Sequence, residues 1–187
     1  MSPKQKLALG IDIGGTNVAF GTVNPDGEIV NYSSVKTHEQ ASIEDLIDLI
    51  YSFCQKENVL DQLTGIGMGA PNGNAFTGQI EFAPNLPWKG ILPLVKLVNE
   101  KFKLPSLLIN DANAAALGEK MFGAATQFTD FVSITLGTGL GSGVFINNSL
   151  VEGKHGFAGE FGHIRVVPNG RDCGCGRKGC LETYASS

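Results

Sequence analysis

The sequence lacks an excess of positive charge. Its 187 residues include 14 lysines and arginines against 18 aspartates and glutamates, which gives a formal net charge of −4. A basic patch is the usual electrostatic footprint of a protein that binds nucleic acid or acidic lipid headgroups. We therefore expect small molecules, and not nucleic acid, as the partners of this chain.

Long hydrophobic runs are missing as well. The apolar run near the N-terminus, residues 7–13, is short and is interrupted by Asp12, so it is neither a secretory signal nor a membrane-spanning helix. A hydrophobic fraction of 42% with 17% charged residues is typical of a soluble globular protein. We expect no association with membranes. Because the cysteines form a candidate metal site of reduced thiols, described below, we also expect a cytoplasmic protein.

Two common nucleotide-binding motifs are also absent. No Gly-x-x-x-x-Gly-Lys-[Ser/Thr] motif occurs, which argues against a Walker NTPase. Residues 137–142 do not have the spacing of the dinucleotide fingerprint, and a strand, not a helix, is predicted to follow them. A Rossmann dehydrogenase is therefore not supported.

Glycine, in contrast, is abundant. It makes up 25 of the 187 residues, or about 13%, against an average near 7%. The glycines cluster at the ends of predicted strands, which suggests a backbone shaped around ligands. Strand and helix patterns alternate along the chain. Strands are predicted at residues 6–13, 18–23, 28–36, 64–70, 106–110, 131–136 and 141–146, and helices at 43–54, 93–104 and 112–122.

The beginning of this pattern recurs in the second half of the chain. Residues 11–16 match residues 134–139 in step, and in each case a strand leads into a glycine turn and then into a second strand. We expect two duplicated lobes, at residues 1–111 and 112–187. Because the chain stops at Ser187 before the elements that completed the first lobe, we expect the second lobe to be truncated.

The two glycine turns are candidate phosphate sites. Successive backbone N–H groups in such a turn form a concave anion site, and a carboxylate such as Asp12 can reach a hydrated Mg²⁺. The alternative is a pair of tight hairpins without a ligand. The predicted phosphate residues are Asp12, Gly14, Gly15 and Thr16 in the first turn, and Gly137, Thr138 and Gly139 in the second.

A histidine and three cysteines near the end of the chain form a candidate metal site, namely His163, Cys173, Cys175 and Cys180. A closed set of four N and S ligands is typical of structural zinc. Cys173 and Cys175 lie too close in sequence for an easy disulfide, and Cys180 would then be unpaired. The alternative is a group of reduced surface thiols in a glycine-rich loop.

Together these motifs resemble the ROK family of repressors and sugar kinases, and within it the bacterial glucokinases most. The motifs are residues 12–16, 110–115, 136–141, 160–163 and the Cys-x-Cys-x₄-Cys loop. The resemblance implies an α/β fold of two actin-like, ribonuclease-H-like lobes, with a sugar and a nucleotide in the cleft. It also implies ATP, Mg²⁺ and Zn²⁺ as cofactors, and a homodimer or higher homo-oligomer.

The resemblance further assigns roles to individual residues. It implies a hexose kinase, with glucose favoured and its 6-hydroxyl phosphorylated, in which Asp111 acts as general base; on its own, Asp111 fits a helix N-cap as well. The implied sugar contacts are Asn85, Asn110, Asp111, Glu160, His163 and Glu182. His163 has two roles here, because one ring nitrogen binds zinc and the other donates to the sugar.

Several alternatives to a glucokinase stay open. N-acetylhexosamine or fructose could replace glucose, and polyphosphate could replace ATP. The family also includes sugar-sensing transcriptional regulators, which carry a winged helix-turn-helix ahead of the first glycine turn. Only a handful of residues precede that turn here, so the kinase is favoured. A third alternative is a zinc-stapled binding module without catalytic activity.

Overall fold

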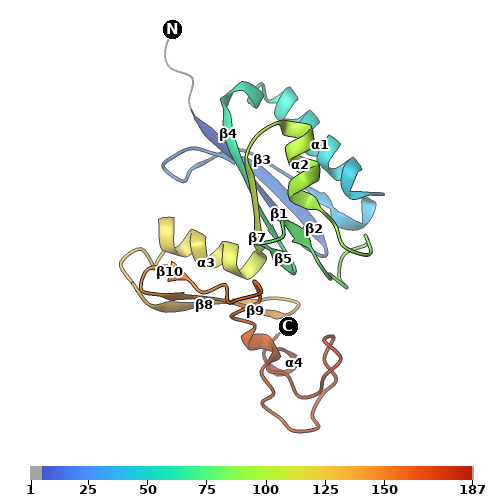
Figure 1. Ribbon diagram of the computed structural model, residues 1–187, viewed down its shortest axis with the longest axis vertical. Coiled ribbons are helices and arrows are strands. Elements are labelled where there is room, and N and C mark those ends of the chain that lie inside the picture. Colours follow the sequence, from blue (N-terminus) through green and yellow to red (C-terminus); the bar gives the residue numbers. More distant parts are fainter. Residues whose placement is uncertain (1–5, 187) are drawn as a thin grey trace. The chain divides into compact units, whose positions relative to one another are not determined.

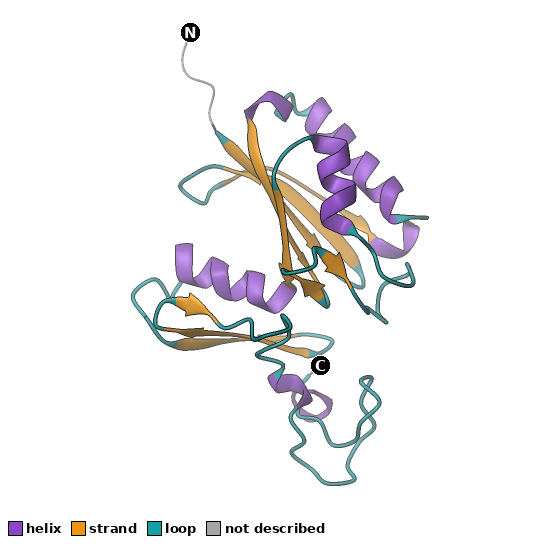
Figure 2. Cartoon of the chain, viewed as in Figure 1, coloured by secondary structure: helices purple, strands orange, loops and turns teal. Residues whose placement is uncertain are grey.

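The computed structural model describes residues 6–186, in which strands, α-helices and short 3-10 helices alternate (Figures 1 and 2). The chain divides into two compact units, of which the first ends at Asp111 and the second begins at Ala112. The parts of the predicted lobes at residues 1–5 and 187 lie outside the described residues. No described helix has the length and apolarity needed to cross a membrane.

The first unit is built on a five-stranded mixed sheet with the order β3-β2-β1-β4-β7. Its first three strands form an antiparallel meander, while β4 and β7 run parallel to β1. Their bounds are β1 Leu7–Ile13, β2 Asn17–Val23, β3 Ile29–Lys36, β4 Leu63–Ala70 and β7 Ser106–Asn110. Two short strands, β5 Gly73–Asn74 and β6 Gln79–Ile80, form a separate hairpin. The sequence patterns predicted all five long strands.

Two helices cover one face of this sheet, α1 Ile43–Lys56 and α2 Leu94–Phe102 (Figure 1). The apolar residues of both helices recur at helical spacing. They include Leu46 and Val98, which are buried in the same core cluster as strand residues such as Leu9. Ser42 caps α1, since its Oγ accepts a hydrogen bond from the Asp45 N–H at 3.0 Å. The predicted helix start is therefore confirmed. The 3-10 helices η1 Thr37–Glu39 and η2 Leu60–Gln62 flank α1.

The carboxyl ends of the three parallel strands meet at one edge of the sheet. Asp12 on β1 is level with Gly69 on β4, and Ala70 at the end of β4 is level with Asn110 at the end of β7. The glycine turn after β1 and the residue Asp111 after β7 therefore lie along the same edge. Ligands of α/β proteins commonly bind outside the carboxyl ends of strands.

The second unit combines a helix with a small antiparallel sheet. Helix α3 Asp111–Phe122, whose first residue belongs to the first unit, is followed by β8 Phe131–Leu136, β9 Leu140–Ile146 and β10 Ser149–Leu150. The sheet order is β10-β9-β8. Small residues let α3 approach β9 closely, because a Cβ on Gly141 or Gly143 would overlap the methyl groups of Ala112 and Ala116.

The β8–β9 hairpin repeats the strand–turn–strand arrangement of the β1–β2 hairpin, but its turn is one residue shorter. In the first hairpin Ile13 pairs with Val18 across the glycine turn, and in the second Leu136 pairs with Leu140. Both hairpins are antiparallel, as the internal repeat predicted. The remainder of the second unit is a long loop region that contains η3 Phe161–His163 and α4 Glu182–Ala185.

Candidate functional site

The first glycine turn connects β1 to β2 and is held from several sides. The Gly14 N–H donates to the Asn17 carbonyl at 2.9 Å, which closes the turn. Behind Gly15 lies Asn85, because a Cβ on Gly15 would come within 3.1 Å of the Asn85 carbonyl oxygen. Gly15 and Thr16 themselves are exposed. The turn thus presents backbone to solvent on one side and rests against the loop of Asn85 on the other.

Two carboxylates lie near this turn. Asp12 projects from β1 and Asp111 follows β7 directly, without an intervening loop. Desolvation by the surrounding strands raises the pKa of Asp12, and the negative charge of Asp111 raises this pKa further. Two carboxylates that repel each other in this way favour a bound cation. A hydrated Mg²⁺ fits this donor set, since it prefers one or two carboxylates and retains several waters.

The predicted sugar residues of the first unit lie at or near this edge. Asn110 ends β7 and is half-buried, as is Asp111, whereas Asn85 is exposed in the loop that follows β6. The contact between Asn85 and the glycine turn brings a predicted sugar residue to a predicted phosphate residue. This proximity could not be foreseen, because Asn85 is separated from Gly15 by 70 positions in the sequence.

The second glycine turn, between β8 and β9, is closed by a 3.0 Å hydrogen bond from the Gly137 N–H to the Gly139 carbonyl. Thr138 is exposed. A Cβ on Gly139 would lie 3.0 Å from the Oε2 atom of Glu182. The structure therefore brings the predicted sugar residue Glu182 next to the predicted phosphate turn of the same unit.

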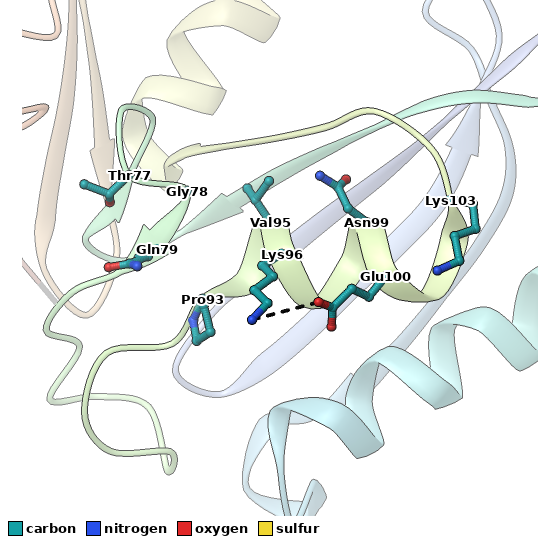
Figure 3. Close-up of a pocket in the computed structure, with 9 residues that line it drawn as sticks. All are labelled: Thr77, Gly78, Gln79, Pro93, Val95, Lys96, Asn99, Glu100 and Lys103. Atoms are coloured by element: carbon teal, nitrogen blue, oxygen red, sulfur yellow. Dashed lines mark ion pairs between the residues drawn. The ribbon is translucent and has the colours of Figure 1, made fainter.

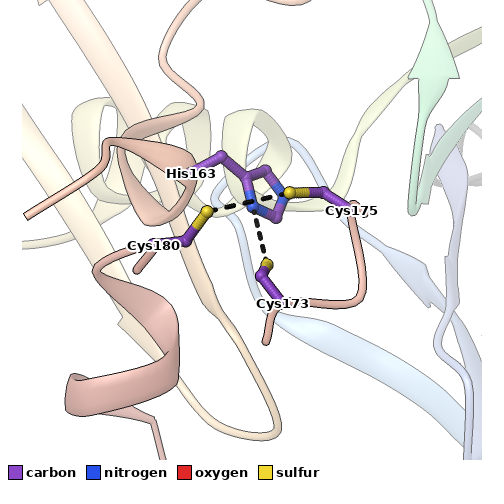
Figure 4. A group of neighbouring side chains, drawn as sticks. All are labelled: His163, Cys173, Cys175 and Cys180. Carbon is purple, nitrogen blue, oxygen red and sulfur yellow. Dashed lines mark hydrogen bonds between the residues drawn. The ribbon is translucent and has the colours of Figure 1, made fainter. Parts of the chain in front are cut away.

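The histidine and three cysteines converge on one point of the second unit (Figure 4). Their ligand atoms all lie within 4.8 Å of one another. The Cys173 Sγ is 3.6 Å from the His163 Nδ1, and the Cys175 Sγ is 3.7 Å from the Cys180 Sγ. Zinc–sulfur bonds of about 2.3 Å and zinc–nitrogen bonds of about 2.0 Å at tetrahedral angles require separations of roughly 3.5–3.8 Å. The donor set therefore fits a zinc ion.

Neighbouring groups shift the pKa values of two of these ligands in opposite directions. A hydrogen bond from Arg177 lowers the pKa of the exposed Cys175 thiol to about 6, which favours the thiolate that a metal requires. Desolvation, followed by a hydrogen bond to Glu182, raises the pKa of the buried Cys173 thiol to about 12. Glu182 Oε1 is also 3.3 Å from His163 Nδ1. One carboxylate thus contacts two candidate metal ligands.

A buried serine ties the loop of the second unit to its sheet. Ser142 on β9 is 5% exposed, and its hydroxyl donates to the Gly159 carbonyl and accepts from the Phe161 N–H at 3.2 Å. Glu160, which precedes η3, accepts a hydrogen bond on its carbonyl from the His163 N–H at 3.1 Å. No sequence pattern pointed to Ser142, because its role depends on a contact across 17 residues.

An open groove of about 510 Å³ lies beside α2, away from these motifs (Figure 3). Its lining includes Thr77, Val95 and Asn99, together with Lys96, which pairs with Glu100 at 3.9 Å. None of the predicted site residues lines it. The predicted site residues therefore lie outside this groove, at or near the two glycine turns and at the histidine–cysteine cluster.

Comparison with known proteins identifies a family. A family model described as the ROK family matches residues 8–187. A glucokinase of Streptomyces coelicolor is 43% identical over 181 residues, which cover 96% of this chain and 56% of that protein. The chain thus spans about half the length of this relative.

Solved structures share the fold. A ROK family glucokinase from Streptomyces griseus, in complex with glucose and AMPPNP, matches with a TM-score of 0.83 and 43% identity over 96% of this chain and 57% of that chain. A ROK family transcriptional regulator, described as a homologue of the E. coli MLC protein, matches with a TM-score of 0.86 and 31% identity over 98% of this chain and 47% of that chain.

Proposed function

The chain belongs to the ROK family, and from this premise we propose that the full-length protein transfers a phosphoryl group from ATP to a hexose. The observation that carries this proposal is the carboxylate pair Asp12 and Asp111 beside an exposed glycine turn. One carboxylate is available for the sugar and the other for the metal that accompanies the nucleotide. Support also comes from the similar Streptomyces griseus glucokinase, which binds glucose and AMPPNP.

Asp111 is the proposed general base. It accepts the proton of the sugar 6-hydroxyl as that oxygen attacks the γ-phosphorus of ATP, and in a loose transition state it mainly orients the nucleophile. The backbone amides of residues 15–16 and 138–139 are proposed to stabilise the phosphate charge, since the N–H groups of Gly14 and Gly137 close their own turns. Bound Mg²⁺ would neutralise part of the charge that develops on the phosphate oxygens.

Sugar recognition is proposed to use Asn85, Asn110, Glu160, His163 and Glu182 together with Asp111. Amide and carboxylate groups can pair with each hydroxyl of a hexose as donor or acceptor, and a site of this kind rejects analogues that lack one hydroxyl. We favour glucose as the substrate. N-acetylhexosamine or fructose, and polyphosphate as the donor, are the alternatives that a substrate panel separates.

Zinc is proposed to have a structural role. His163 turns its Nδ1 toward the thiols of the cluster, so its Nε2 is the nitrogen left to donate to a sugar hydroxyl. The four ligands come from two segments, η3 and residues 173–180, and a metal would hold both in place. We further propose that the full-length protein is cytoplasmic and forms a homodimer or larger homo-oligomer.

A sugar-sensing transcriptional regulator is the second candidate. It is favoured by the match to the ROK family regulator, whose TM-score of 0.86 exceeds that of the glucokinase structure. The negative net charge of the chain speaks against DNA binding by these residues themselves. Operator binding by the full-length protein without hexose phosphorylation would favour the regulator.

The direct test is the variant Asp111→Asn in the full-length protein, assayed with a coupled enzyme on a panel of hexoses. Loss of the general base should lower kcat by about 10²- to 10⁴-fold with the preferred hexose. Asp26→Asn serves as the matched control, because Asp26 is exposed in the β2–β3 hairpin. Full activity of the Asp111→Asn variant would refute the assigned role.

A further inference from the structure

Residues 37–40, which contain η1, connect the first glycine turn to the loop of Asn85; we call these residues the brace. We propose that the brace sets the position of the first glycine turn, hereafter the phosphate turn, relative to this loop. We further propose that Thr37 and Trp88 are positioning residues for phosphoryl transfer. The inference rests on the proposed kinase function and concerns residues to which that function assigns no role.

Thr37 holds the phosphate turn through two hydrogen bonds. Its hydroxyl donates to the Gly14 carbonyl at 2.7 Å, and its backbone N–H donates to the Thr16 carbonyl at 3.0 Å. The residue is 0% exposed, so water does not compete for these bonds. A buried hydroxyl with a single well-placed acceptor fixes the orientation of that carbonyl.

This orientation determines where the neighbouring amide points. In a trans peptide the N–H group points away from the C=O group of the same peptide plane. Because the Gly14 carbonyl faces the Thr37 hydroxyl, the Gly15 N–H is directed to the opposite side of the turn. The Gly15 N–H is one of the groups proposed to donate a hydrogen bond to the phosphate, so Thr37 orients this group without contacting the ligand.

The other end of the brace holds the loop that carries Asn85. The Gln40 carbonyl accepts a hydrogen bond from the indole Nε1 of Trp88 at 3.2 Å, and Trp88 is 8% exposed. Trp88 follows Asn85 by three positions. The backbone of Asn85 in turn abuts Gly15. The phosphate turn, the brace and the loop of Asn85 therefore contact one another in all three pairs, and each segment restrains the positions of the other two.

Such a closed arrangement matters for the proposed reaction. Phosphoryl transfer requires the attacking oxygen to lie about 3–3.5 Å from the phosphorus, and a misplacement of about 1 Å can lower the rate about 100-fold. The phosphate turn is proposed to bind the phosphates of ATP, and the loop of Asn85 is proposed to bind the sugar. Loosening one end of the brace should therefore affect one substrate more than the other.

The test compares variants of the full-length protein in steady-state kinetics with ATP and its preferred hexose. Thr37→Val keeps the shape of the side chain but removes the hydroxyl, and it should raise the KM for ATP about 10-fold or more while the KM for the hexose changes less than about twofold. Thr37→Ser restores the donor and should restore the ATP KM. Trp88→Phe removes the indole N–H and should mainly raise the hexose KM.

Thr64→Val is the matched structural control. The Thr64 hydroxyl donates to the Leu7 carbonyl at 3.0 Å, in the same sheet but at its other end. Its loss should leave both KM values unchanged, whatever its effect on Tm. If Thr37→Val lowers Tm but alters neither KM nor kcat, or raises both KM values equally, the brace proposal is wrong.

Calorimetric titration with a non-hydrolysable ATP analogue separates this inference from the proposed function. If the wild type phosphorylates no hexose but binds the analogue, the kinase proposal fails. In that case weaker binding by Thr37→Val, with recovery in Thr37→Ser, still supports the brace, and unchanged binding overturns it. A wild type that neither binds the analogue nor phosphorylates a hexose overturns both.

Discussion

At the scale of single residues, two neighbours prepare the candidate metal ligands in opposite ways. Arg177 donates a hydrogen bond to Cys175 and stabilises its thiolate. Glu182 accepts a hydrogen bond from the Cys173 thiol at 2.7 Å and stabilises its protonated form. Binding of a metal therefore requires Cys173 to release a proton, whereas Cys175 is already largely deprotonated at neutral pH.

Removing the guanidinium in an Arg177→Gln variant should raise the pKa of Cys175. The side-chain hydrogen bond from Arg177 stabilises the thiolate and holds this pKa at about 6, below its ordinary value of 9.0. The pH at half-maximal alkylation of Cys175, measured by mass spectrometry on chelator-treated protein, should therefore move from about 6 toward 9. Because the folded pKa is the lower one, the stabilisation it provides is lost as the pH falls through 6.

Lys178→Gln is the control for this measurement. Lys178 pairs with Asp172 at 3.1 Å, so its removal deletes a nearby positive charge without deleting the hydrogen bond to Cys175. An equal shift in both variants would show that general charge, and not the Arg177 contact, sets the pKa.

The four candidate ligands could be predicted from the sequence, but the two neighbours could not. Cysteines separated by glycine in a short loop, with a histidine nearby, are typical of a zinc site. Arg177 and Glu182 act on the thiols through side-chain hydrogen bonds. The geometry of these bonds depends on how the loop folds back on itself, which no spacing of residues encodes.

At the scale of elements, long periodic segments could be predicted and short ones could not. The repeat of apolar residues predicted that α1 starts at residue 43, and the structure shows Ser42 as its N-cap. Two-residue strands such as β5 and β10 contain too few residues for any periodicity. The brace was missed for a different reason. A threonine after a strand has no sequence signature, and only its buried contacts across 23 residues reveal its part in the site.

Glycines of the cysteine loop should differ sharply in their tolerance to substitution. Gly179 has a φ of +77°, and a Cβ there would overlap the Val167 carbonyl oxygen. In the full-length protein, Gly179→Ala should strain the loop by about 1–3 kcal/mol in addition to this overlap, and the zinc content measured by elemental analysis should fall. Gly174→Ala should retain zinc, because no atom beyond the adjacent residues lies within 4 Å of a Cβ there. Equal zinc content in the two variants would contradict this expectation.

At the scale of the whole molecule, the two units bury very different amounts of apolar surface. The main hydrophobic cluster runs from Leu7 to Leu108 and lies within the first unit. The internal repeat makes the contrast quantitative: Ile11 and Ile13 on β1 are 5% and 1% exposed, whereas their counterparts Ile134 and Leu136 on β8 are 56% and 65% exposed. The duplication was visible in the sequence, but the unequal cover of its two copies was not.

The 187-residue chain should therefore open locally in its second unit first. Amide protection follows local burial, and segments with few buried apolar contacts exchange at lower free energy. Hydrogen exchange followed by mass spectrometry should show faster exchange for peptides of β8 and β9 than for peptides of β1 and β4. Slower exchange in β8 than in β1 would contradict the expectation drawn from the exposed side chains.

The buried indole of Trp88 is the only one in the sequence. All tryptophan fluorescence of the protein consequently arises from a single position, three residues from Asn85 and hydrogen-bonded to the Gln40 carbonyl. Emission from such a fluorophore responds to small changes in its polar environment. The molecule therefore carries an intrinsic optical probe. Ligand binding near the loop of Asn85 can be titrated by the change in tryptophan emission, without a label.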